Sequence, residues 1–291
     1  MKSMLTNAKG DEQMPDIKQN PGVLAIGWDV GGWMGKNHGV AACFWDKQSD
    51  SLVWIGTPKK LSIPRGSYIS IDHILSELTE KSENVYANEL FQNGESSVII
   101  GADAPLGVPV AFHNLIDVNA NQTETRELME KQQLQLINRP AKEIENPFAY
   151  RYTDRFIYSK FNKKPLSAVF DRLGNNCTAA IGHALKWQHD YGFQINPIHT
   201  RGNACKIGSR QIIEVYPALV SEQLQSFLNE FLPKHYKFAD WDRQHDFDAA
   251  ICAIMAACHG AGNFSKKLPE LVPPPEDISE VDTEGWIYYI P

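Results

Sequence analysis

Several features that would place a chain in a familiar class are missing from this sequence. No apolar run approaches 18 residues, so we expect no membrane-spanning helix. The first residues lack the apolar segment of a signal peptide. The five cysteines form no Cys-x-x-Cys pair and are odd in number, and three of them lie in apolar runs. We therefore expect reduced, packed thiols and a cytoplasmic location.

An excess of positive charge is missing too. The net charge of -7 argues against a broad basic surface that holds nucleic acid by charge alone, although a local basic groove can coexist with an acidic metal site. No Gly-x-Ser-x-Gly elbow is present, which argues against a metal-independent serine hydrolase. The composition, with 43% hydrophobic and 22% charged residues, is that of a globular protein with a sizeable core.

Hydrophobic patterning predicts the order of strands and helices. Residues 1–20 are polar and read as a flexible arm. Strands are expected at 22–29, 38–46, 51–58, 96–103 and 210–220, the first three as an antiparallel meander. Helices are expected from 71 onward with Ser70 as a cap, and at 123–137, 176–192, 220–232 and 243–260. A Pro-rich acidic connector and a tail, expected as an edge strand or packed segment, end the chain. This order is typical of an α/β fold with a mixed sheet.

Four carboxylates fall at the ends or edges of the expected buried elements: Asp29, Asp103, Glu214 and Asp248. In an open α/β sheet, ligands gather beside the carboxyl ends of the strands. Carboxylates crowded there repel one another unless protons or cations neutralise them. Hard oxygen ligands of this kind suit Mg²⁺ or Mn²⁺, and a pair of such ions can support phosphodiester cleavage.

Each strand-end carboxylate also has a purely structural interpretation. Asp29 precedes two glycines and can be a turn former, and Asp103 can stabilise a proline turn through an Asx bond. Glu214 can pair with one of three nearby bases, Arg201, Lys206 or Arg210.

The stretch RQHDFDAAICAIMAACHG, residues 243–260, predicts an apolar helix that opens with a histidine and two aspartates. Asp246 is expected as the N-cap. Positions three apart share a helix face, so His245 and Asp248 can point together toward the strand ends. Asp248 then becomes a candidate metal ligand, and His245 a candidate for proton transfer or phosphate contact.

Taken together, the segments WDVGG, GADAPLG, EVYPA, HDFDAAICA and EGWIYYIP resemble a domain-of-unknown-function family of predicted RNase H-like nucleases. The resemblance spans about residues 22–291, and residues 245–249 are also similar to the last catalytic helix of Holliday-junction resolvases. It implies an RNase H-like domain over 21–265, with a five-stranded mixed sheet flanked by helices and a helical insertion at 110–200. Residues 266–291 would form a connector and a tail packed on that domain. It also implies a metal site made from Asp29, Asp103 or Glu214, and Asp248.

Bases alternate with aromatic residues in the segment YRYTDRFIYSKFNKK, residues 150–164. This pattern suits phosphate contacts combined with base stacking, although such a run can also hold core aromatics and solvated bases. Its RYTDR element resembles an Arg-x-x-Asp element of the same family, which makes Arg151 and Asp154 site candidates beside Arg155. In the run before the Glu214 strand, Lys206 and Arg210 can add further basic side chains to this substrate-contacting surface.

The resulting hypothesis is an Mg²⁺- or Mn²⁺-dependent nuclease or phosphodiesterase with nucleic acid as its substrate. Asp29, Asp103 and Asp248 would hold the metals, Glu214 would be a fourth ligand or an orienting carboxylate, and Arg151 would contact phosphate. Two alternatives remain open. One is a nucleotide-dependent phosphotransferase of the actin-like or sugar-kinase type, because residues 29–42 are similar to a first phosphate loop, although without its Thr or Ser. The other is a catalytically inactive binding module.

Overall fold

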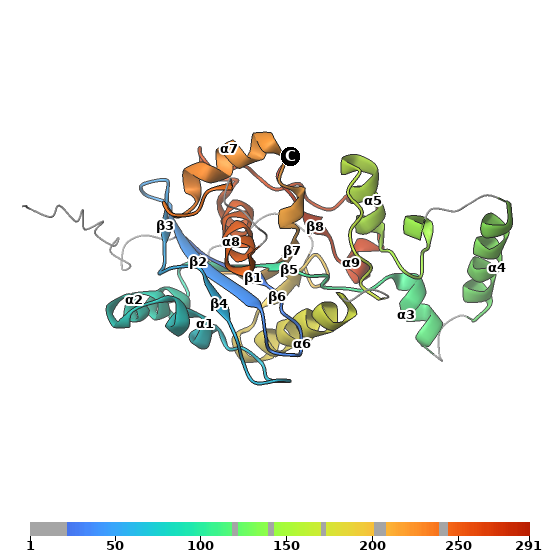
Figure 1. The fold of residues 1–291 in the computed structure, drawn as a ribbon, viewed down its shortest axis with the longest axis horizontal. Coiled ribbons are helices and arrows are strands. Elements are labelled where there is room, and N and C mark those ends of the chain that lie inside the picture. The colour runs from blue at the N-terminus through green and yellow to red at the C-terminus, as the bar shows by residue number, and fades with distance from the viewer. Residues whose placement is uncertain (1–21, 118–121, 139–142, 170–172, 201–207, 239–243) are drawn as a thin grey trace, which may run out of the picture.

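The computed structural model describes residues 22–117, 122–138, 143–169, 173–200, 208–238 and 244–291. These ranges form a mixed sheet flanked by helices (Figure 1), as the sequence predicts. The sheet order is β3-β2-β1-β5-β7-β6, with β4 also paired to β2 and β8 to β7. The strands are β1 (Gly22–Asp29), β2 (His38–Asp46), β3 (Ser51–Trp54), β4 (Lys59–Leu61), β5 (Ser97–Asp103), β6 (Gln194–Asn196), β7 (Arg210–Val215) and β8 (Ile287–Tyr288).

The predicted meander is confirmed, because β2 lies antiparallel to both β1 and β3. The strand expected at 51–58 ends early at Trp54, and the chain turns at Gly56, whose φ is 66°, before β4 pairs again with β2. The sheet has eight strands where five were expected, since β4, β6 and β8 add two or three residues each along its margins. The five longest strands run in the order β3-β2-β1-β5-β7.

The helices are α1 (Ile71–Leu78), α2 (Lys81–Gln92), α3 (Val110–Ile116), α4 (Gln122–Asn138), α5 (Tyr152–Phe161), α6 (Leu173–Tyr191), α7 (Glu222–Phe231), α8 (His245–Ala261) and α9 (Val281–Glu284), with 3-10 turns η1 (Glu143–Glu145) and η2 (Pro217–Leu219). Ser70 caps α1 as predicted, accepting a hydrogen bond from the His73 N–H. The polar stretch before β5, for which the patterning predicts no separate helix, contains α2.

Successive side chains along each strand point to opposite faces of the sheet and so enter two separate cores. Ala25, Cys43 and Ile213 pack against α8, α7 and the C-terminal segment on one face. Leu24 and Ile26 pack with α1, α2 and α6 on the other. Figure 1 shows these two helical layers on either side of the sheet. Because helices cover both faces of the sheet, side chains on both sides of β1, β2 and β5 are buried. This explains why these strands are continuous apolar runs in the sequence.

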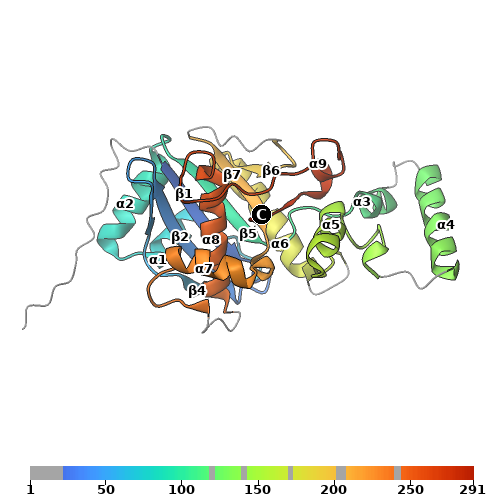
Figure 2. The same cartoon turned by 90° about the horizontal axis from the view of Figure 1, so that it is seen from above.

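Two parts of the chain extend this three-layer body. Helices α3 and α4 lie beyond α5, at the end of the molecule away from α2 in both views (Figures 1 and 2). At the other extreme of the sequence, β8 pairs in parallel with the end of β7, and Trp286, Ile287, Tyr288 and Tyr289 are buried. The four described cysteines are free and buried, as the apolar runs predict.

Candidate functional site

Asp29 and Asp103 lie side by side at the carboxyl ends of two adjacent strands. Strands β1 and β5 are parallel, and their register pairs Asp29 with Asp103 as its last step. Because side chains at paired positions of parallel strands point to the same face, the two carboxylates emerge together. The predicted proximity of these two residues is therefore confirmed.

Helix α8 brings two more site residues to this edge. His245 Nδ1 lies 2.5 Å from Asp29 Oδ2, and Asp248, one turn further on, faces the same cavity as Asp29. The predicted shared face of positions 245 and 248 thus holds. Asp246 does not cap the helix, because α8 begins one residue earlier and its N-cap is Gln244. The Asp246 carboxylate instead accepts a hydrogen bond from the Tyr236 hydroxyl at 2.7 Å.

The three aspartates line a cavity of about 230 Å³. Its other walls come from the turn after β5, the segment after β7, the segment between α5 and α6, and the first turn of α6; among these lining residues are Pro105, Tyr216, Pro217, Leu166 and Asn176. Asn176 also fixes the chain just after Asp29, since its side-chain amide donates to the Val30 carbonyl at 2.7 Å. Tyr216 lies in the EVYPA segment but was not singled out as a site candidate, and Asn176 carries no sequence signal that separates it from ordinary surface residues.

The electrostatics of this cavity are those of crowded acids. Burial raises the pKa of Asp29 to about 6; His245 opposes this shift, and the charge of Asp248 adds to it. Burial also raises the pKa of Asp103 well above its usual range, and the negative charges of Asp29, Asp248 and Glu214 raise it further. A nearby cation would relieve this repulsion.

The chemistry of the donor set fits a hard divalent cation, because three carboxylates share one cavity and the charges that raise the pKa of Asp103 come from Asp29, Asp248 and Glu214. Within the described ranges, however, no three His, Cys, Asp or Glu side chains are already grouped so that they could hold one ion. Asp29 is turned toward His245 in this arrangement.

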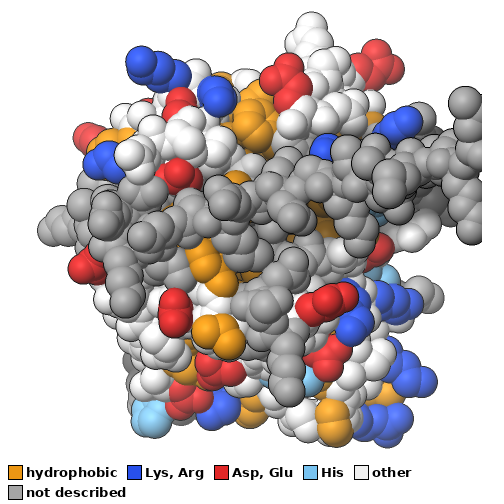
Figure 3. Space-filling view, turned by 90° about the vertical axis from the view of Figure 1, so that its left-hand side faces the viewer, with side chains coloured by type: hydrophobic (Ala, Val, Ile, Leu, Met, Phe, Trp, Pro, Cys, Tyr) orange, Lys and Arg blue, Asp and Glu red, His pale blue; other side chains and the backbone are white. Residues whose placement is uncertain are grey.

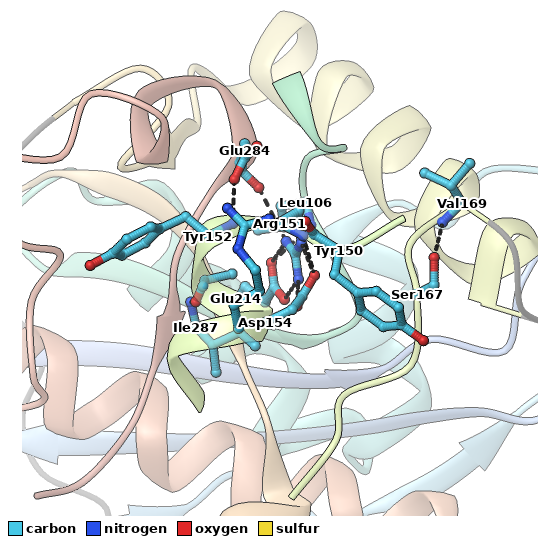
Figure 4. A network of polar contacts seen from close by, with 12 residues as sticks. Leu106, Tyr150, Arg151, Tyr152, Asp154, Ser167, Val169, Glu214, Glu284 and Ile287 are labelled. Carbon is cyan, nitrogen blue, oxygen red and sulfur yellow. Dashed lines mark hydrogen bonds and ion pairs between the residues drawn. The ribbon is translucent and has the colours of Figure 1, made fainter. Parts of the chain in front are cut away.

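Arg151 belongs to a buried ion cluster, drawn in Figure 4, whose members Arg151, Asp154 and Glu214 also line the cavity. Its Nη1 and Nη2 each lie 2.7 Å from an oxygen of Glu214, and its Nε and Nη2 bond Asp154 at 3.1 and 2.9 Å. Its last N–H donates to the Glu284 carbonyl. All five guanidinium N–H groups are used and the residue is 1% exposed. No N–H is left for a substrate phosphate, so this geometry does not support the predicted contact.

Glu214 is paired with a basic residue that lies 63 positions away in the sequence. Both of its oxygens accept from Arg151, and one also accepts from the Leu106 N–H at 3.1 Å. Burial raises the pKa of Glu214, and Arg151 opposes the shift. Because its oxygens are occupied, Glu214 fits the role of an orienting carboxylate, which fixes the turn after Asp103, better than that of a fourth ligand.

Three predicted substrate contacts lie elsewhere. Arg155 bonds the Tyr150 carbonyl at 2.6 Å and lines a second cavity between α3, α4 and α9. Arg210 stands at the opposite end of β7 from Glu214 and donates to the carbonyls of Tyr191 and Phe91. Lys206 lies outside the described residues.

The aromatic and basic segment at 150–164 packs inward for the most part. Tyr150 is fully buried, and the Lys160 ammonium lies 4.5 Å from the centre of the Tyr289 ring and bonds its hydroxyl. The interpretation of this run as packed aromatics with supporting bases therefore describes it better than a stacking surface. Glu284 was not foreseen, yet its carboxylate accepts from the N–H groups of Tyr152 and Val110 and ties α9 to α5 and α3.

Comparison with protein-family models, curated proteins and solved structures finds no match to this chain. In the part of the chain that the structure describes, no helix is both long and apolar enough to cross a membrane. On the face drawn in Figure 3, the described acidic and basic side chains occur in small interspersed groups rather than as one broad basic patch.

Proposed function

We propose that this protein is a divalent-metal-dependent phosphodiesterase acting on nucleic acid, built on an RNase H-like fold. The observation that carries the proposal is the parallel register that pairs Asp29 with Asp103, with Asp248 from α8 facing the same cavity. The order of the five longest strands, with β2 antiparallel to its neighbours β1 and β3, supports the fold assignment.

Asp29, Asp103 and Asp248 would hold Mg²⁺ or Mn²⁺, which when bound would polarise the scissile phosphate and a water molecule. The chain's own residues prepare this site. His245 orients the Asp29 carboxylate through Nδ1 and can accept or release a proton there. Glu214, clamped by Arg151, holds the Leu106 N–H and thereby the turn that follows Asp103.

The test is cleavage of labelled single-stranded, duplex, hybrid and branched DNA and RNA with Mg²⁺ or Mn²⁺. We expect wild type to cleave at least one substrate, and Asp29→Asn to lose roughly 100-fold or more, since changes outside the first ligand shell alone cost about 10- to 100-fold. EDTA should abolish cleavage.

Asp72→Asn is the matched control, because Asp72 is exposed on α1 and bonds only the Tyr191 hydroxyl among the contacts seen for it. It should cleave like wild type. Cleavage that survives both EDTA and Asp29→Asn would overturn the metal site, and no cleavage across the whole panel would overturn the nuclease assignment.

A further inference from the structure

A half-buried tryptophan on the loop after β1 meets an exposed tyrosine on the loop before α1. Trp33 and Tyr68 meet edge to face, with ring centres 5.5 Å apart at an interplanar angle of 85°. Tyr68 is 47% exposed, and Met34, next to Trp33, is 49% exposed. Large apolar side chains grouped at a surface mark interaction sites more often than singly scattered ones do.

The Trp33 ring is held in place rather than free to collapse. Its backbone N–H donates to the Asn175 side chain at 3.3 Å, and its indole N–H donates to the Thr178 hydroxyl at 3.0 Å. Gly182 lets the ring approach α6, since a Cβ there would lie 2.9 Å from it. A ring fixed in this way loses little further freedom when a flat ligand stacks beside it.

Two basic side chains flank the two rings. The loop after β1 and the loop before α1 are joined by hydrogen bonds from Ile63 to Gly35 and from Gly66 to Trp33, of 2.7 and 2.9 Å. Lys36 and Arg65 lie on these joined loops, and both are exposed. Neither forms an ion pair with another residue that the structure describes.

This surface adjoins the carboxylate cavity. Asn175 contacts Trp33, and the next residue, Asn176, lines the cavity and holds Val30. Trp33 follows Asp29 by four residues, so their Cα atoms lie at most about 14 Å apart. A strand that crosses the cavity can therefore reach the rings within a few nucleotides.

We propose that Trp33 and Tyr68 form a stacking platform for an unpaired base of a single-stranded nucleic acid, with Lys36 and Arg65 contacting its phosphates. Aromatic rings beside lysine and arginine side chains suit single-stranded nucleic acid, because every unpaired nucleobase offers a face for stacking, while a duplex hides those faces. The inference rests on the proposed function and names its substrate as single-stranded at this position.

Binding is measured without metal, in EDTA, by fluorescence anisotropy of labelled single-stranded oligonucleotides, so that cleavage plays no part. We expect Tyr68→Ala to weaken binding roughly tenfold, within the range that stacking of one base supports, and Tyr68→Phe to bind like wild type. Trp33→Ala should weaken binding similarly, and oligonucleotides with abasic sites should bind wild type as weakly as intact ones bind Tyr68→Ala.

Phe264→Ala is the control, since Phe264 is also an exposed aromatic beside a lysine, with the Lys47 ammonium 5.3 Å from its ring. It should bind like wild type. Equal binding by Tyr68→Ala and wild type, or no binding of any single strand by wild type, would overturn the platform. Cleavage with unchanged Tyr68→Ala binding would refute the platform alone, whereas platform-dependent binding without any cleavage would refute the nuclease alone.

Discussion

At the scale of single residues, Arg151 has a structural role that its place in a basic run conceals. Its guanidinium is enclosed by Glu214, Asp154 and the Glu284 carbonyl, and the two carboxylates are almost fully buried with it. A buried charge pair of this kind need not raise net stability, but removing one partner leaves the other uncompensated.

Arg151→Met should therefore lower the free energy of unfolding by about 3–5 kcal/mol, because Glu214 and Asp154 would stay buried without their cation. Urea denaturation measures the change. Arg126→Met provides the comparison: Arg126 is 72% exposed and its Nε lies 3.7 Å from Glu130, so its loss should cost less than about 1 kcal/mol. Equal losses in the two variants would contradict the assigned role.

At the scale of elements, α8 lies unusually close to the sheet because glycines face it. A Cβ on Gly39 would lie 1.7 Å from the His245 carbonyl oxygen, and one on Gly27 would lie 1.9 Å from that of Ala249. Gly101 on β5 makes a similar approach to Cys252, at 2.5 Å. These contacts set the height of α8 above the strands and thus the position of Asp248 beside Asp29 and Asp103.

Gly101→Ala should push α8 outward, because the added methyl group meets backbone rather than a movable side chain. We expect a loss of about 1–3 kcal/mol in thermal unfolding, as for other overpacked cores. Gly174→Ala in α6 is the matched change, since its Cβ would lie 3.5 Å from the nearest atom. That variant should be neutral or more stable by about 0.5–1 kcal/mol. If the Gly101→Ala protein were as stable as Gly174→Ala, the close packing of α8 on β5 would not require glycine at position 101.

At the scale of the whole molecule, a buried polar network joins α8 to three strands. His259 on α8 bonds Gln211 on β7 at 2.9 Å, Gln211 accepts from Asn196 on β6, and Asn196 accepts from the Tyr288 hydroxyl on β8. Burial lowers the pKa of His259 from 6.5 to about 4. The unfolded chain therefore binds a proton below pH 6.5 that the folded protein excludes until about pH 4.

Folding stability should consequently fall as the pH drops from about 6.5 to 4, by on the order of 3 kcal/mol from His259. The raised pKa of Asp29 acts in the opposite direction below about pH 6, so the measurement is the difference between His259→Gln and wild type in denaturant midpoints. His259→Gln should lose less stability than wild type between pH 7.5 and 4.5. The exposed His113→Gln should follow wild type, and parallel pH profiles for all three proteins would refute the prediction.

The sequence by itself determined the elements whose signal is local. Continuous apolar runs predicted β1, β2, β5 and β7, helical spacing predicted α1, α6 and α7, and Ser70 predicted its cap. It also predicted that Asp29 and Asp103 each end a buried strand, because an apolar run and the turn residues after it can be read from adjacent positions, whereas the parallel pairing of the two strands came from the tertiary structure.

Only the tertiary structure decided which side chains pair across long separations. Arg151 and Glu214 are 63 residues apart, and nothing in either local pattern distinguishes an arginine that enters a buried cluster from one that meets solvent. The same holds for the aromatics: Tyr150 is buried while Tyr68 is exposed, although each lies within three residues of an arginine in the sequence. Periodicity reports whether a position is inside or outside its own element, whereas exposure and pairing depend on what the rest of the chain packs against it.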